Sequence, residues 1–426
     1  MEWILVLIYT ILFSFFLKKW RFFYINIPFK LLLTVFLVKI IAGCGIAYIY
    51  SNFYNGGDTF TYMKDARLIY SSLPHSPLIY LQLITGIETD PQSLAYYYQH
   101  FDSVNFADFN KTFKDPLIIL RFNAFLCLFS FGYYYVQLVF MCFLSMIGLT
   151  ALYKTAQTIS SCNKLLLFFS CFGIPSVLAW GSSILKEPIV LFLIGIMIWK
   201  FYQCLSERKT INWVLFVLTG ILLMLIKPYI MTIMVPGLIA WLIFFSYKKS
   251  LTWIMSGAYT LFFLIAVVLS KISEGLNVFR ILNDQQIIYM KNAVYYPANS
   301  LVELIPFAPN PLSVLKRIPD ALVMSMTRPN FSESKNILQQ FSALENCMVL
   351  AFVVFLLVHI DLKKLKIHPL AQLCIISGLA IVVVAAYTTP VLGTLVRIKM
   401  PGVLLLLFGL AACTKISFYR IPKTQS

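Results

Sequence analysis

The residues best suited to chemistry form a short polar motif after an early apolar segment, Asn55-Gly56-Gly57-Asp58-Thr59-Phe60-Thr61-Tyr62. Two adjacent glycines permit a tight turn with positive φ, and such a turn would hold the Asp58 carboxylate at the membrane surface. Tyr62 would share a helix face with Asp58 if a helix begins there. The carboxylate could then act as a general base on a hydroxyl acceptor. The structural alternative is that Asp58 only N-caps that helix, a position that aspartate favours.

A second motif places ionisable residues at the junction of two apolar segments, where they are costly and usually have a partner or a role. It runs from Phe172-Gly173-Ile174-Pro175-Ser176 through Trp180-Gly181-Ser182 to Lys186-Glu187-Pro188. Pro188 suits the first turn of a helix that Glu187 opens, and Lys186 would then hold a phosphate as a point charge. The alternative is a Lys–Glu pair that marks the lipid boundary. Lys227 is either a third cation for an anionic ligand or part of a short turn.

Two arginines with nearby acids complete the candidate binding residues. Arg328 precedes Glu333 in a polar stretch, Glu345 begins a later apolar segment, and Arg397 opens the last one. The planar guanidinium group can contact two oxygens at once, which suits diphosphate recognition. For both arginines the alternative is a structural ion pair with Glu333 or Glu345.

Cysteine and histidine show no metal-binding spacing. The nine cysteines include no CxxC pair, and the four histidines do not cluster along the sequence. Neither a P-loop nor a dinucleotide-binding glycine pattern is present. The sequence therefore predicts no metal site, no cofactor and no disulfide, although it leaves a divalent metal requirement open.

The composition indicates what must position these residues. The chain of 426 residues is 60% hydrophobic and only 12% charged. A helical span needs roughly 20 apolar residues, and hydropathy predicts about eleven spans in an all-α, polytopic transmembrane bundle that forms a single domain over 1–426. The spans are predicted at 3–17, 29–51, 122–153, 164–184, 187–204, 211–226, 228–247, 251–270, 345–360, 368–388 and 397–414. Segment 122–153 is longer than one span and allows a re-entrant start.

Six hydrophilic breaks between the spans are rich in basic residues and set the predicted orientation. They lie at Lys18–Lys30, Lys154–Lys164, Lys200–Ile211, Lys248–Ser250, Asp361–His368 and from Lys415 onward, and they hold 17 of the 34 basic residues but only two acids. Because such loops stay in the cytoplasm, we expect the N-terminus outside, the C-terminus inside and the candidate residues at the outer face. The long segments 52–121 and 271–344 also fall outside, as short helices on the membrane surface. This topology accounts for the net charge of +17, so no nucleic-acid partner is expected.

Taken together, three features resemble the C-type superfold of integral-membrane glycosyltransferases, which use polyprenyl-phosphate-linked sugars as donors. They are Gly56-Gly57-Asp58-Thr59 with Tyr62, Pro175-Ser176 with Trp180-Gly181-Ser182 before Lys186-Glu187, and the late Arg397. The resemblance implies that Asp58 deprotonates the acceptor. In that family the acidic loop usually follows the first span, whereas here it follows the second. The chain is also similar to bacterial O-antigen and exopolysaccharide polymerases in its span count and its outer-face arginines.

The predicted function is transfer of a sugar from a lipid-linked donor to a glycan, lipid or protein acceptor at the outer face of the inner (plasma) membrane, in cell-envelope polysaccharide biosynthesis. The donor phosphate would lie near Lys186, Lys227 and Arg397, and its tail would lie in a groove open to membrane lipids. One alternative is a polymerase that joins two lipid-linked glycans. Another is a transporter or flippase for an anionic lipid-linked glycan, for which only Lys39 lies near mid-membrane. A third is a non-catalytic assembly protein whose outer loops are docking surfaces.

Overall fold

The computed structural model is almost entirely helical where it is described. It describes residues 1–54, 56–87, 91–103, 115–159, 162–247, 250–295, 301–302, 304 and 307–416. Within these ranges the chain forms 20 α-helices and two isolated β-bridges, but no strand. The predicted all-α fold class is therefore confirmed. Asn55 of the first motif, Lys248 and Lys249 of the fourth basic break, and the tail beyond Ile416 lie outside the described residues.

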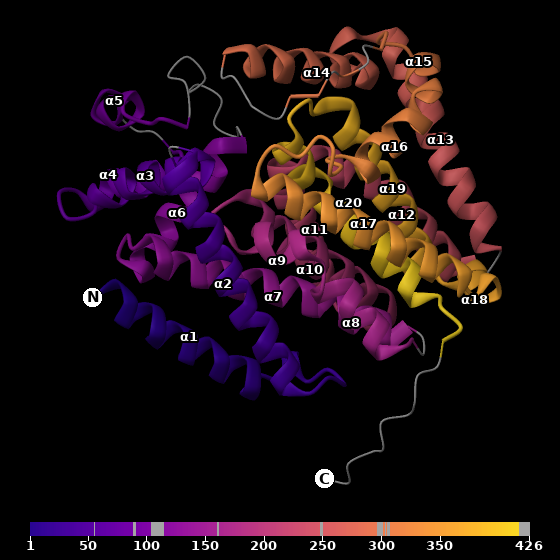
Figure 1. The fold of residues 1–426 in the computed structure, drawn as a ribbon, viewed down its shortest axis with the longest axis horizontal. Coiled ribbons are helices and arrows are strands. Elements are labelled where there is room, and N and C mark those ends of the chain that lie inside the picture. Colours follow the sequence, from indigo (N-terminus) through magenta and orange to yellow (C-terminus); the bar gives the residue numbers. More distant parts are fainter. Residues whose placement is uncertain are drawn as a thin grey trace. The chain divides into compact units, whose positions relative to one another are not determined.

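The helices belong to two compact units (Figure 1). Unit 1 comprises Met1–Lys154 and Val177–Pro228, and unit 2 comprises Thr155–Ser176 and Tyr229–Ser426. Unit 1 contains α1 (Glu2–Lys19), α2 (Phe29–Phe53), α3 (Gly57–Ser71), α4 (Pro77–Thr85), α5 (Pro91–Gln99), α6 (Asp115–Ser130), most of α7 (Tyr134–Ile159), α10 (Lys186–Glu207) and α11 (Thr210–Ile226). Unit 2 contains α8 (Lys164–Phe172), nearly all of α12 (Pro228–Tyr247), α13 (Leu251–Ile272), α14 (Val278–Tyr295), α15 (Pro311–Lys316), α16 (Ile318–Thr327), α17 (Ile337–Val358), α18 (Leu362–Ile367), α19 (Pro369–Thr388) and α20 (Leu392–Ala412). The chain passes between the units within α7, α9 (Pro175–Ala179) and α12.

Eight helices in the described ranges are long and apolar enough to span a membrane, which identifies a multi-pass membrane protein. They are α2, α7, α10, α12, α13, α17, α19 and α20. The bent pair Lys164–Phe172 and Pro175–Ser182, with an angle of 58°, gives up to nine. Two of the eleven predicted spans are not among these helices: α1 carries Glu2, Lys18 and Lys19 at its ends, and α11 is a shorter apolar helix of 17 residues.

The predicted segment 122–153 is two helices rather than one. Phe131 and Gly132 have φ values of 53° and 72° and separate α6 from α7. Within unit 1, α6 packs against α3 and α4, and Figure 1 draws these three helices close together. A helix of 16 residues that packs on other short helices fits the re-entrant start that the sequence allows.

Glycine allows a close helix crossing in each unit. In unit 1, a Cβ on Gly195 of α10 would overlap the carbonyl oxygen of Gly148 on α7. In unit 2, a Cβ on Gly378 of α19 would lie 2.7 Å from the carbonyl oxygen of Gly402 on α20. Small residues at such contacts bring helix backbones together, which supports helix association in a bilayer.

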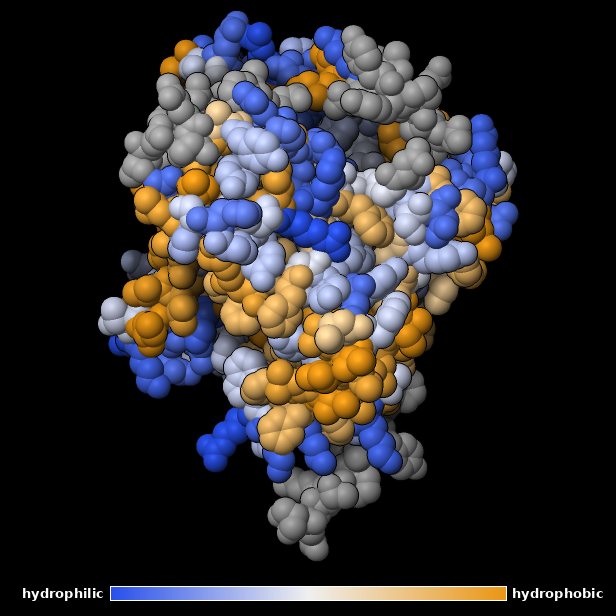
Figure 2. Space-filling view, turned by 90° about the vertical axis from the view of Figure 1, so that its left-hand side faces the viewer, coloured by the Kyte–Doolittle hydropathy of each residue, from blue (hydrophilic) through white to orange (hydrophobic). Residues whose placement is uncertain are grey.

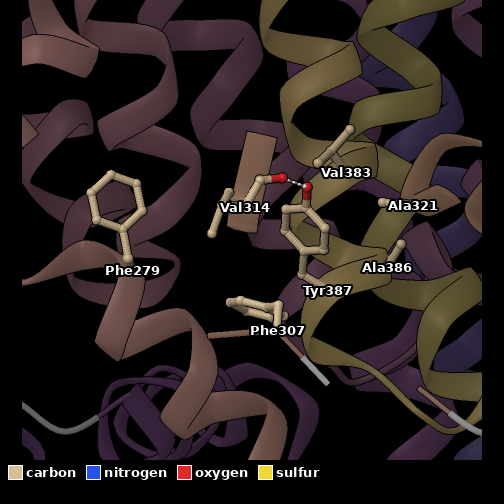
Figure 3. Close-up of a cluster of buried hydrophobic side chains, with 7 residues drawn as sticks. All are labelled: Phe279, Phe307, Val314, Ala321, Val383, Ala386 and Tyr387. Carbon is tan, nitrogen blue, oxygen red and sulfur yellow. Dashed lines mark hydrogen bonds between the residues drawn. The ribbon is translucent and has the colours of Figure 1, made fainter. Parts of the chain in front are cut away.

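The long segment before α17 covers part of unit 2 with short helices. Helices α14 and α16 both pack on α19, and their contact buries Phe279, Phe307, Ala321, Ala386 and Tyr387 together with Val314 and Val383 (Figure 3). The hydroxyl of Tyr387 donates a hydrogen bond to the carbonyl oxygen of Val314 at 2.6 Å. A buried tyrosine hydroxyl needs such a partner, so Tyr387 ties α15 to the spanning helix α19.

The surface of the molecule carries many exposed apolar side chains. On α1, Trp3, Ile4, Leu7, Ile8 and Ile11 are all exposed and recur at the spacing of one helix face. Figure 2 shows broad hydrophobic patches on one face of the molecule. Soluble proteins rarely expose apolar patches of this extent to water, whereas lipid chains in a membrane would cover them.

Candidate functional site

The glycine pair before Asp58 forms the predicted positive-φ turn. Gly56 has φ +94° and is the N-cap of α3, and Gly57 has φ +53°. Asp58 therefore lies in the first turn of the helix and not at the N-cap, and its side chain is exposed. A negative charge in the first turn is favoured by the helix dipole, so the start of α3 suits an acidic side chain at this position.

Tyr50 connects this turn to the second motif. A Cβ on Gly57 would lie 2.6 Å from the Tyr50 ring, so only glycine allows α3 to begin here. The Tyr50 ring also contacts Trp180, with ring centroids 6.2 Å apart and nearly perpendicular planes. Unit 1 therefore brings together the Gly-Gly-Asp turn and the Trp-Gly-Ser segment, which are more than 100 residues apart in the sequence.

Lys227 has a protein partner, as expected of a structural ion pair. Its Nζ lies 3.3 Å from Oε1 of Glu187, and the side chains are only 10% and 3% exposed. Glu187 lies in the first turn of α10, and Lys227 separates α11 from α12. Since α10 packs along α11, the pair closes the end of this helix pair. Lys186, at the start of α10, is half-buried.

Arg328 lies in a polar turn of unit 2 that follows α16. Its Nε lies 3.2 Å from Oε1 of Glu333, so an ion pair between these two residues forms. The two side chains are 38% and 30% exposed. Inside the turn, the Asn330 side-chain oxygen accepts hydrogen bonds from the backbone N–H of Glu333 and the hydroxyl of Ser332. The Arg328–Pro329 peptide bond is cis.

Lys399, which the sequence did not single out as a functional residue, holds this turn in place through hydrogen bonds. It is 4% exposed within α20. Its Nζ donates to the carbonyl oxygens of Ser325 and Arg328 and to the Asn346 side-chain oxygen, at 2.5, 3.3 and 2.8 Å. An ammonium group has three donors, so all are satisfied, and two of them meet carbonyls at the C-terminal end of α16, where a cation is favoured. The sequence signal that could have identified Lys399 is its position inside an otherwise apolar predicted span, where a lysine is costly.

The remaining predicted residues of unit 2 are held by other elements. Glu345 is buried on α17, and its carboxylate accepts a hydrogen bond of 3.0 Å from the backbone N–H of Ser176 at the start of α9. The Pro175-Ser176 motif and Glu345 therefore meet. Arg397 is half-buried near the start of α20.

The predicted residues are thus divided between the units. Asp58, Tyr62, Lys186, Glu187 and Lys227 belong to unit 1, and Arg328, Glu333, Glu345 and Arg397 belong to unit 2.

Two buried ionisable side chains in unit 1 serve the backbone. Lys39, fully buried in α2, donates to the carbonyl oxygen of Val177 at 3.1 Å. Asp65, fully buried in α3, accepts from the backbone N–H groups of Asp102 and Ser103 and from the Ser103 hydroxyl. Burial of either charge costs free energy, which the hydrogen bonds offset. Lys39 thereby holds α9 in place, and Asp65 holds the segment after α5.

No group of three or more His, Cys, Asp or Glu side chains that could hold a metal ion occurs within the described part of the chain. Comparison of the chain with protein-family models, with curated proteins and with solved structures finds no match.

Proposed function

We propose that this protein is a membrane glycosyltransferase that moves a sugar from a polyprenyl-phosphate-linked donor to an acceptor at the extracytoplasmic face. Asp58 is the general base that takes the proton of the acceptor hydroxyl. The acceptor oxygen then bonds to the anomeric carbon of the sugar, and the lipid phosphate leaves with the electron pair of the broken bond. Base catalysis of this kind typically contributes about 10²–10⁴-fold.

The observation that carries the proposal is the Asp58 turn. An exposed carboxylate follows two positive-φ glycines at the start of α3, and the second of these glycines packs against the Tyr50 ring. A turn that only ended one helix and began another would not require an acid after the glycines.

The first alternative, a polymerase of lipid-linked glycans, uses the same chemistry with a second lipid-linked substrate. The second, a transporter or flippase, would use ionisable residues within the spans. Lys39 and Lys399 are such residues, but the hydrogen bonds of both Nζ groups to backbone carbonyls support structural roles. We therefore favour transfer over transport.

The orientation belongs to the same proposal: a plasma-membrane location, with the N-terminus outside and the C-terminus in the cytoplasm. Cysteines introduced at 60–85 and 275–290 should react with an impermeant thiol reagent added outside. Cysteines at 20–30 and 361–367 should not. Labelling of 361–367 by a reagent added outside would show that the proposed orientation is wrong.

The reaction is tested with purified protein and a panel of polyprenyl-phosphate sugars, with mass spectrometry of the products. Asp58→Asn should abolish product formation while donor binding and thermal unfolding stay unchanged, because the amide keeps the size of the side chain but cannot accept a proton. Asp102→Asn is the matched control, since Asp102 is an exposed acid of unit 1 that pairs with Lys64, and it should retain activity. Full turnover by Asp58→Asn would end the base assignment.

A further inference from the structure

A cavity of about 930 Å³ lies within unit 2, between α14, α16 and the end of α19. Its volume is at the upper end of the range of roughly 300–1,000 Å³ for ligand sites. Its charged lining residues are Arg317, Asp320 and Arg328, so the lining carries one net positive charge. Its positive charge therefore comes from two guanidinium groups that flank α16, and Gln286, Thr327 and Asn330 add neutral polar groups to the lining.

Each arginine is oriented by a carboxylate that leaves part of its guanidinium group available. Nη1 of Arg317 lies 3.2 Å from Asp320, and Nε of Arg328 lies 3.2 Å from Glu333. A guanidinium group carries five N–H donors, so one carboxylate does not use all of them. Arginine held in this way presents further N–H donors in a fixed plane, which suits an oxyanion such as phosphate.

Most of the other lining residues are apolar and form an apolar wall. Phe307, Ala321, Ala386 and Tyr387 line it and belong to the buried cluster of Figure 3. At its edge, Val323 is 63% exposed and Met290 is 39% exposed. A soluble phosphate would gain nothing from this wall, whereas a lipid chain would bury it and could extend past the exposed Val323.

Lys399 fixes the position of Arg328 from outside the cavity. Through its hydrogen bonds to Ser325 and Arg328 it holds the end of α16 against α20, and Asn346 of α17 completes the anchor. A site for a defined anion needs such support, because an unanchored turn would lose conformational entropy on binding.

We infer that this cavity binds the phosphate and the first isoprene units of a polyprenyl phosphate, with Arg317 and Arg328 as the phosphate ligands. The choice of a polyprenyl lipid rests on the proposed function, whereas the amphipathic anion follows from the lining alone. The inference assigns the headgroup to residues other than Lys227, whose charge is matched by Glu187.

Binding is measured with the full-length protein in phosphatidylcholine nanodiscs, using a polyprenyl phosphate, the corresponding neutral polyprenol and inorganic phosphate as probes. We expect the polyprenyl phosphate to bind at least 10-fold more tightly than either of the others. Equal affinity for polyprenol would show that the arginines do not contribute to binding. Equal affinity for inorganic phosphate would show that the apolar wall does not contribute. Either result would overturn the inference.

The residues are tested by Arg317→Gln and Arg328→Gln, each of which should weaken binding of the polyprenyl phosphate about 10- to 100-fold. Arg280→Gln is the matched control, because Arg280 is a similarly exposed arginine of unit 2 that pairs with Glu274 and Asp284 and does not line the cavity. Arg317→Lys and Arg328→Lys, which keep the charge, should bind with intermediate affinity, and they replace the Gln variants if those fail to fold. Folded variants that bind within 2-fold of the unmodified protein would refute the assignment.

This assay involves no transfer, so it separates the two proposals. Tight, arginine-dependent binding without transfer from any donor would leave the cavity assignment standing and remove the glycosyltransferase proposal. Transfer activity that is unchanged in both Gln variants would leave the glycosyltransferase proposal standing and remove the cavity assignment.

Discussion

Lys227 and Arg328 are both cations near the ends of apolar helices, but the two units use them differently. In unit 1, Lys227 and Glu187 are almost fully buried and match each other's charge. In unit 2, Arg328 shares one edge of its guanidinium group with Glu333 and is more than one third exposed at the margin of a cavity. The comparison teaches that position near a span end does not distinguish a structural cation from a binding cation. The two are distinguished by the burial of the side chain and by the number of its N–H donors that the acidic partner does not use.

The largest expected effect is on the buried pair. Lys227→Ala leaves the Glu187 carboxylate buried without this partner, and breaking such a pair typically costs about 3–5 kcal/mol. We expect a large loss of thermal stability, measured as the midpoint of unfolding in detergent. Adding Glu187→Gln should restore much of that loss, because the uncompensated charge is then gone. If Lys227→Ala unfolds at the same temperature as the unmodified protein, the pair does not stabilise unit 1 and the comparison fails on that side.

The second effect concerns a buried ionisable group of unit 2 that directly precedes the spanning helix α19 (Pro369–Thr388). His368 is 2% exposed and caps α19, because its Nδ1 accepts a hydrogen bond from the backbone N–H of Ala371 at 3.2 Å. Burial, and secondarily the charge of Lys364, lowers the pKa of His368 from 6.5 to about 4. Above pH 6.5 the imidazole is neutral in the folded and unfolded states, so it contributes no pH dependence there.

As the pH falls below 6.5, the unfolded chain binds the proton first, and the free energy of unfolding decreases until pH 4, where the folded state is protonated as well. At about 1.4 kcal/mol per pH unit, the total loss is on the order of 3 kcal/mol. Unfolding midpoints measured between pH 7 and pH 4 should therefore fall. His368→Asn, which retains an N-cap acceptor, should show a flatter profile. An identical slope in the variant would mean that other groups cause the pH dependence.

The sequence predicted some of this arrangement because the signals were local. Gly56 and Gly57 predicted a positive-φ turn from the residue type alone, and long apolar runs predicted most of the spanning helices. The length of 122–153 indicated a re-entrant start, but the position of the break at Phe131 was not predicted, because hydropathy continues across it and a non-glycine residue adopts positive φ there.

Side-chain partners were less predictable, because they come from distant segments. The carbonyl oxygen of Ser325 that binds Lys399 is 74 residues away in the sequence. Apolar periodicity does not reveal which carbonyls at the end of α16 need a donor. Likewise, the pairing of Glu187 with Lys227 depends on the packing of α10 along α11, and not on the spacing of charged residues.

The smallest expected effect is the stability change on removing Arg328, and it is the sharpest test of the comparison. A half-exposed ion pair is typically worth about 0–1 kcal/mol, so Arg328→Gln should shift the unfolding midpoint no more than Arg280→Gln does. The same variant is expected to weaken polyprenyl phosphate binding strongly, whereas Lys227→Ala should act on stability first. This opposite pattern is what separates a binding cation from a structural one. A destabilisation by Arg328→Gln as large as that of Lys227→Ala, measured in the same detergent, would show that Arg328 is also structural, and the contrast between the two units would then disappear.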